Sequence, residues 1–224
     1  MHESPLETAI LFHLGPVPVT NPVVTTWGII MVLSVAAWLL TRGMTTRNPS
    51  RRQMVLELLV EGISWQIREI IGKDIRPFLP LLGTLFIFLV TANLSGLLPG
   101  LASPTAKIET PAALALIVFF SVHYFGVQAR GPLGYLASFA KPKLVMLPLN
   151  LIAEVTRTFS LMVRLFGNVM SGEFLLGLVV ALAGLFVPIP FMVLEVLVGL
   201  VQAYIFTILA TVFIGAAVGV AGHG

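Results

Sequence analysis

Long apolar stretches separated by short polar connections dominate the pattern of this sequence. A membrane-spanning helix needs roughly 20 mostly apolar residues, and several stretches approach or exceed that length. Pro188 and Pro190 divide the last two, because proline cannot continue the helical hydrogen-bond ladder. The pattern predicts five spanning segments, at residues 24–41, 78–98, 111–129, 144–185 and 188–222.

The last two segments are too long to cross a bilayer upright. At 1.5 Å per residue, a helix of about 40 residues is about 60 Å long, against a hydrocarbon core of about 30 Å. Each must be strongly tilted, kinked or partly outside the membrane. We therefore expect an all-α, polytopic membrane protein forming a single domain over residues 1–224, with a long tilted helical hairpin at 144–222.

Residues 51–76 show a different pattern, in which apolar residues recur at helical spacing and charged residues lie mostly on the other face. This pattern predicts an amphipathic helix on the membrane surface or against another subunit. A short linker helix without a partner is the simpler alternative. The apolar positions are Val55, Leu58, Leu59, Ile63, Ile67, Ile70 and Ile71.

Composition supports the membrane assignment. The chain is 57% hydrophobic and 10% charged, with a mean hydropathy of +0.99, whereas a soluble domain carries about 25% charged residues. The absence of cysteine excludes a disulfide framework, a Cys-ligated zinc and a cysteine nucleophile. Acidic residues and prolines stand where a secretory signal would be basic, so we expect no signal peptide. No metal-ligand spacing, phosphate-binding loop or nucleophile triad is evident, and we expect no cofactor, metal or nucleic-acid partner.

Basic residues predict the topology, because loops rich in Lys and Arg remain in the cytoplasm. The second and third segments are joined by a loop with Lys107 as its single basic residue. This distribution predicts an external N-terminal segment at 1–23, an amphipathic helix at 51–76 on the cytoplasmic side, and a cytoplasmic C-terminus. The basic residues of the other two connections are Arg42, Arg47, Arg51, Arg52, Arg68, Lys73 and Arg76, and then Arg130, Lys141 and Lys143.

Polar residues interrupt the last two segments. Ionisable groups at membrane depth cost at least a few kcal/mol each and usually mark an ion path. Counting from the turn near residue 187, Glu173 and Glu195 lie in the external half, and Arg164 and Gln202 lie near the centre. The full set is Glu154, Arg157, Ser160, Arg164, Asn168, Ser171 and Glu173, followed by Glu195, Gln202, Tyr204 and Thr207.

Structural explanations for these charges stay open at this point. Arg164 could form a buried salt bridge with Glu195 or Glu173. Glu154 and Arg157, three residues apart, could be an ordinary ion pair at the cytoplasmic end of the helix.

Two motifs within these segments resemble a known family. The sequence R-L-F-G-N-x-x-x-G-E begins at Arg164, and L-x-Q-A-Y-I-F surrounds Gln202. Together they resemble subunit a of the membrane (Fo) sector of rotary F-type ATP synthases, most strongly over residues 144–215. The stretch PLLGTLFIFLVTANLSGLLP at 80–99 is also similar to that family.

The resemblance implies a role for each matching residue. Arg164 matches the essential arginine that meets the carboxylate of the rotating c ring. Asn168, Glu173, Glu195 and Gln202 match positions that line the half-channels. Glu154 and Ser160 match positions near the internal half-channel.

The resemblance also implies partners and a location. The partners are the c ring, the b subunits of the peripheral stalk, the rest of the complex and the lipid bilayer, and ATP chemistry belongs to other subunits. The location is a bacterial plasma (inner) membrane, and the transported ion is H⁺ or Na⁺. One of the positions held by Glu173 and Glu195 is often histidine in the family, so two glutamates make this path more acidic. The short chain resembles a variant group that is sometimes associated with sodium.

Two other functions fit the residues without the resemblance. An independent secondary ion transporter or channel would use Glu173, Arg164 and Glu195 as its site. A structural membrane scaffold would use the same charges as buried ion pairs.

Overall fold

The computed structural model describes residues 10–14, 17–42, 51–72, 74–97, 103–139, 146–184 and 187–219. Nearly all of this described chain is helical. The helices are α1 (Asn21–Thr41), α2 (Arg51–Ile71), α3 (Leu79–Ser95), a single 3₁₀ turn η1 (Pro104–Ala106), α4 (Glu109–Arg130), α5 (Pro132–Phe139), α6 (Met146–Ala183) and α7 (Pro188–Val218).

The five predicted spanning segments correspond to α1, α3, α4, α6 and α7. Four of these are long and apolar enough to cross a membrane, and α3 is a shorter apolar helix of 17 residues. The predicted amphipathic helix is α2, which ends at Ile71 because Gly72 has a φ of +66°, a conformation that favours glycine. The all-α, polytopic fold class is therefore confirmed.

Two elements were not predicted. Strands β1 (Ile10–Leu14) and β2 (Val17–Thr20) form an antiparallel hairpin within the predicted N-terminal segment 1–23, of which residues 1–9, 15 and 16 lie outside the described chain. Helix α5 begins at Pro132, directly after Gly131 turns the chain with a φ of +74°. Both elements are too short to stand out against the apolar pattern of the long helices.

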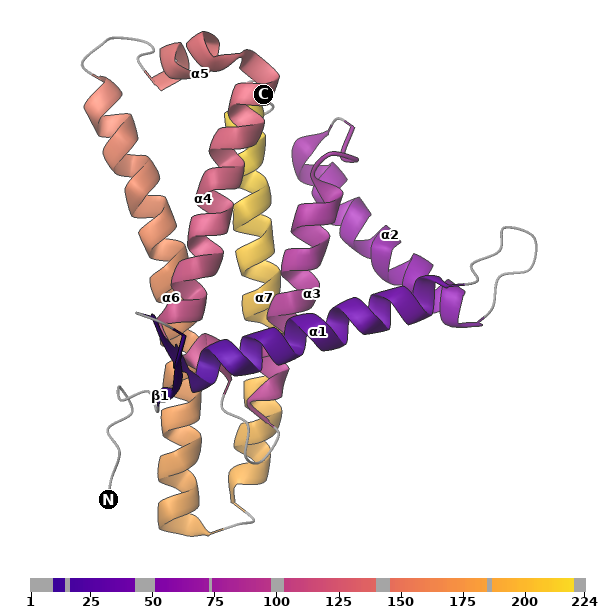
Figure 1. The fold of residues 1–224 in the computed structure, drawn as a ribbon, viewed down its shortest axis with the longest axis vertical. Helices are drawn as coiled ribbons and strands as arrows, with labels where there is room; N and C mark the ends of the chain where they lie inside the picture. Colours follow the sequence, from indigo (N-terminus) through magenta and orange to yellow (C-terminus); the bar gives the residue numbers. More distant parts are fainter. Residues whose placement is uncertain are drawn as a thin grey trace.

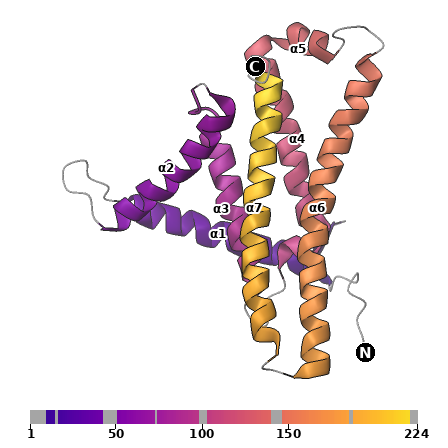
Figure 2. The ribbon, with the colours of Figure 1, turned by 180° about the vertical axis from the view of Figure 1, so that it is seen from behind.

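Helices α4, α6 and α7 run side by side along the longest axis of the molecule, and α3 packs beside α7 (Figures 1 and 2). Helix α1 runs across this bundle (Figure 1). The directions of α1 and the α6–α7 hairpin differ so much that all three helices cannot be perpendicular to one membrane plane. With 21 residues, α1 is about 31 Å long, close to the thickness of the hydrocarbon core.

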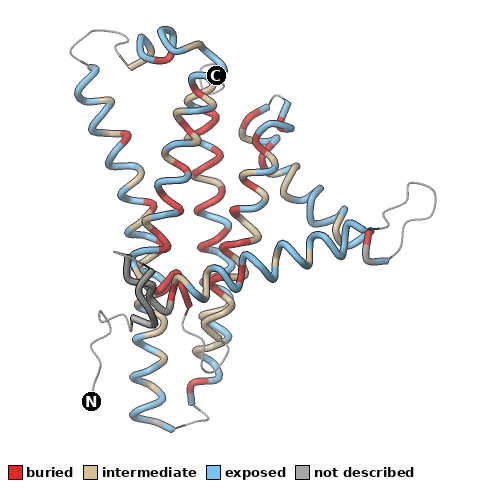
Figure 3. The backbone as a smooth tube through the Cα atoms, in the orientation of Figure 1, coloured by how far each residue is buried: buried red, intermediate tan, exposed pale blue. Residues whose placement is uncertain are grey.

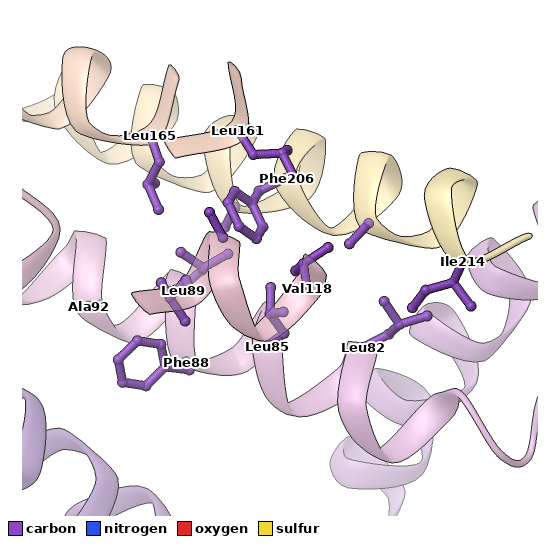
Figure 4. Close-up of a cluster of buried hydrophobic side chains, with 14 of the residues drawn as sticks. Leu82, Leu85, Phe88, Leu89, Ala92, Val118, Leu161, Leu165, Phe206 and Ile214 are labelled. Atoms are coloured by element: carbon purple, nitrogen blue, oxygen red, sulfur yellow. The ribbon is translucent and has the colours of Figure 1, made fainter. Parts of the chain in front are cut away.

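The core lies where α3, α4, α6 and α7 meet (Figure 4). Leu82 and Leu89 from α3, Leu165 from α6 and Phe206 from α7 each have 0% of their surface exposed. Burial is concentrated on the facing sides of these helices, whereas most of α1 is exposed (Figure 3). An apolar helix exposed around most of its circumference is stable only in an apolar solvent, which fits an integral membrane protein.

A close contact between Gly126 and Tyr135 fixes the corner between α4 and α5. A Cβ atom added at Gly126 would lie 2.3 Å from the Tyr135 ring, so the contact requires glycine. Burial raises the pKa of the Tyr135 phenol, and the nearby Glu154 carboxylate raises it further. The phenol therefore stays neutral at physiological pH, and α5 is held across the end of the bundle by an uncharged, buried side chain.

The replacement Gly126→Ala is expected to destabilise this corner. Overpacking of a filled site typically costs about 1–3 kcal/mol, because the ring or the helix must move. Gly134→Ala in α5 is the matched control, since its added Cβ meets its nearest neighbour at 3.7 Å. The measurement is the thermal stability of the purified protein in detergent, and equal stability of the two variants would contradict the expectation.

Candidate ion path along the α6–α7 hairpin

Arg164 lies in the middle of α6 and is exposed at the surface of the protein. Ion pairs join Arg157 to Glu154 and Arg76 to Asp74, and Arg164 has no carboxylate partner in the described part of the chain. The structural salt bridge between Arg164 and Glu173 or Glu195, considered from the sequence, is therefore contradicted. Among the described residues, the permanent cation of Arg164 is therefore unpaired on an apolar helix.

The surroundings of Arg164 form a polar stripe along the exposed face of α6. Apart from the adjacent pair Gly167 and Asn168, its successive members lie three or four residues apart, which places them on one face of the helix. On the adjoining face of the helix, Leu161, Leu165 and Val169 are buried in the core. A Cβ added at Gly167 would meet no atom within 4 Å, so the stripe is open. The polar stripe consists of Arg157, Ser160, Arg164, Gly167, Asn168 and Ser171.

One turn beyond Arg164, a hydrogen bond joins the two long helices. The Asn168 side-chain Nδ2 donates to Oε1 of Gln202, which is only 2% exposed. The amide nitrogen of Gln202 has no hydrogen-bond partner in the described part of the chain. A buried donor without a partner is costly, and a bound water would supply the missing partner.

A cavity of about 330 Å³ opens between α3, α6 and α7 toward the turn end of the hairpin, the end near residues 184–187. Its polar lining consists of Asn93, Asn168, Ser171, Glu195 and Gln202. The Glu195 carboxylate lies over Gly172, where an added Cβ would approach its Oε1 to 3.0 Å. Gly172 thus leaves room for the carboxylate at the wall of the cavity.

Glu173 is the next residue, but it faces a different neighbour. Its half-buried carboxylate accepts a hydrogen bond of 2.9 Å from the backbone N–H of Ser103, just before η1. Gly96, at the end of α3, also lies against this carboxylate. The carboxylates of Glu173 and Glu195 are still close enough to interact electrostatically. The two predicted site residues are therefore neighbours held by different elements.

Sequence reasoning missed a buried polar cluster beside Glu173. Asn93, Ser103 and Thr105 are between 0% and 6% exposed and hydrogen-bond to one another. An asparagine within the apolar run of α3 was a usable signal. Ser103 and Thr105 gave none, because a short loop between two helices is expected on the surface.

A second, smaller cavity of about 160 Å³ lies toward the open end of the hairpin, where α6 begins and α7 ends. Glu154, 8% exposed, lines it with Arg157, Asn150 and Tyr135. The predicted pair exists, with Arg157 Nη1 3.4 Å from Glu154 Oε2. Ser160 lies on the polar stripe and does not line this cavity.

The described residues hold no group of three or more His, Asp or Glu side chains suited to a metal ion. On the α6–α7 hairpin, these described residues place the unpaired Arg164 midway along α6. A cavity lined by Glu195 lies toward one end of the hairpin, and a cavity lined by Glu154 lies toward the other. This arrangement belongs to the class of polytopic helical membrane proteins that handle ions.

The comparisons with known proteins specify the family. The family model described as ATP synthase A chain matches residues 23–215. The chain belongs to this family. It is 68% identical to "ATP synthase subunit a 2" of a Bradyrhizobium species over 224 residues, the full length of both chains.

More distant relatives carry the same name. The chain is 46% identical over 211 residues to "ATP synthase subunit a 2" of Pelobacter propionicus, covering 94% of this chain and 92% of the relative. It is 45% identical over 224 residues to "ATP synthase subunit a 2" of Acaryochloris marina, covering 100% of this chain and 95% of the relative.

Proposed function

We propose that this chain is the ion-translocating stator subunit in the membrane sector of a rotary ATP synthase. The observation that carries the proposal is Arg164, which is exposed on the polar stripe of α6 and has no ion-pair partner among the described residues. A guanidinium at membrane depth is costly unless it meets an anion or water. A carboxylate on the rotating c ring would supply that anion, and the open surface at Gly167 would let the ring approach closely.

The charge of Arg164 explains how ion flow is coupled to rotation. Arginine stays protonated at any working pH, and in a low dielectric it stabilises a bare carboxylate strongly. A ring carboxylate that arrives opposite Arg164 therefore releases its ion. The same fixed positive charge repels a cation that would otherwise pass directly between the two half-channels. Ions must travel round with the ring.

The two cavities support separate access paths on either side of Arg164. On α6, Glu154 lies ten residues before Arg164 and Glu173 nine residues after it, or about 15 Å and 14 Å along the axis. The cavity lined by Glu195 and Gln202, with Glu173 beside it, forms the external half-channel. The cavity lined by Glu154 forms the internal half-channel, with Ser160 between it and Arg164.

The exposed surfaces of α6 and α2 suit the partners that we propose. The polar stripe of α6 faces the c ring, and the amphipathic α2, with its exposed Val55 and Leu58, lies at the cytoplasmic surface against lipid or the b subunits. The chain contributes no ATP site to the complex. It resides in a bacterial plasma membrane with its N-terminus outside, and it carries H⁺ or Na⁺.

Cysteine labelling tests the assigned paths and their orientation. Single cysteines at Glu173 and Glu195 are expected to react with small soluble thiol reagents added from outside, because both positions border the external path. A cysteine at Ala203, next to Gln202 but 0% exposed, is the matched control and is expected to stay unlabelled. Labelling of both positions from the cytoplasmic side alone would overturn the orientation.

A further inference from the structure

Four residues of the connection between α3 and α4, Ser103–Ala106, are buried to an unusual degree. Ser103 is 1% exposed, Thr105 0% and Ala106 5%, and Pro104 is buried with them. Loops normally run over the surface, because their backbone groups need water as a partner. The segment Ser103–Ala106 instead packs against α1, α3, α4 and α6. It is therefore part of the protein interior.

Hydrogen bonds anchor this segment to α3 directly and, through Asn93, to α7. Thr105 Oγ1 donates to Asn93 Oδ1 of α3 over 2.9 Å, and Asn93 Nδ2 donates to the backbone carbonyl of Gly199 in α7 over 2.9 Å. Ser103 Oγ lies 2.7 Å from Thr105 Oγ1 and 2.9 Å from the Ala92 carbonyl oxygen. Asn93 thus ties the segment to the wall of the cavity that also holds Glu195.

The first residue of the anchored segment, Ser103, also contacts Glu173 of α6. The Ser103 N–H donates to Glu173 Oε1 over 2.9 Å, and Gly96 lies against the same oxygen. Two charged side chains lie close enough to interact electrostatically with this carboxylate. They are Lys107, which follows η1, and Glu195 on α7. Hydrogen bonds to an ionised carboxylate are about twice as strong as neutral ones. A rigid backbone donor therefore sets which way the carboxylate points.

We propose that the segment Ser103–Ala106 is a positioning element of the ion path, and that its Ser103 N–H holds one oxygen of Glu173 so that the other faces the ion. The proposal rests on the proposed function, because it assigns Glu173 to the external half-channel. In the described part of the chain, the second oxygen of Glu173 has no hydrogen-bond partner. A backbone N–H keeps its proton, so the orientation persists through each cycle of ion uptake and release.

The backbone at Ser103 permits a direct test. Its φ of −62° suits proline, so Ser103→Pro removes the N–H without forcing a new backbone angle there, and it places a ring carbon where the hydrogen was. Ser103→Ala is the matched variant that loses the hydroxyl but keeps the N–H. Both are made in the complete ATP synthase and reconstituted into liposomes. The measurement is gradient-driven ATP synthesis while the luminal ion concentration is varied.

Ser103→Pro is expected to lower the synthesis rate about fivefold or more relative to Ser103→Ala, and to change the luminal ion concentration that gives half-maximal rate. The amount of assembled complex should be the same in both. In a Glu173→Gln background, the difference between proline and alanine should largely disappear, because the N–H acts through the carboxylate. A purely structural role would leave that difference intact, and this result would overturn the proposal.

The remaining outcomes separate the proposal from the function on which it rests. If Glu173→Gln alone supports normal synthesis, Glu173 is not on the path and its assignment fails. If Glu173→Gln is impaired but proline and alanine at position 103 are equivalent, only the positioning role fails. If the proline variant does not assemble, Glu173→Asp replaces it, because this change keeps the charge and withdraws the carboxylate from the N–H. Normal synthesis and ion dependence in Glu173→Asp would then overturn the positioning role.

Discussion

Replacing Arg164 with alanine is expected to abolish ATP-driven ion pumping while the complex still assembles. The guanidinium is exposed and unpaired in the described part of the chain, so its removal leaves no buried acid without a partner. The membrane sector should also leak ions once the catalytic sector is stripped away, because the fixed positive charge between the half-channels is gone. Ion flux in membrane vesicles measures both effects, with the catalytic sector present for pumping and removed for the leak.

The Arg164→Lys variant distinguishes the effect of the positive charge from the effect of the guanidinium geometry. Lysine keeps one positive charge but loses the planar fork of donors, and a desolvated lysine can lose its proton. We expect no pumping by this variant either. Arg76→Ala, which removes an arginine whose side chain is 90% exposed, is the control for a lost positive charge. An assembled Arg164→Ala complex that pumps at near-normal rates would show that the half-channel mechanism is wrong for this protein.

The second large effect is expected at the two glutamates. Glu173→Gln and Glu195→Gln should each slow ion transport only partly, because each removes one carboxylate from the proposed external path while the other remains. The double variant should be slower by about tenfold or more, which corresponds to about 1.4 kcal/mol or more in the barrier. Transport should stay coupled to ATP turnover, since Arg164, which we propose separates the half-channels, is intact.

Transport and ATP hydrolysis are measured together in vesicles, so that slowing and uncoupling are distinguished. Glu61→Gln with Glu69→Gln is the matched control, because it also removes two carboxylates but from the exposed face of α2. Unchanged transport in the double variant at positions 173 and 195 would place the external path elsewhere. A loss of coupling without a loss of ion flux would contradict the separate role assigned to Arg164.

The sequence by itself determined the helices and the order of the site along them. Apolar length set α1, α3, α4, α6 and α7, because a bilayer accepts only long helices whose backbone groups are satisfied internally. Helical spacing of apolar and charged residues set α2. The site residues were found because ionisable groups in an apolar run are costly. Their order along one hairpin predicts successive membrane depths for Glu154, Arg164 and Glu173.

The tertiary structure alone decided which polar groups meet. Asn93 and the Gly199 carbonyl are 106 residues apart in the chain, and Ser103 and Glu173 are 70 apart. No local pattern encodes such contacts, because they depend on how the helices cross. A helix in lipid is apolar on its exposed faces as well as its buried ones, so the pattern did not show which face packs inside. The same ambiguity hid the unpaired state of Arg164, the burial of Ser103–Ala106 and the crossing of α1 over the bundle, all of which follow from packing between helices.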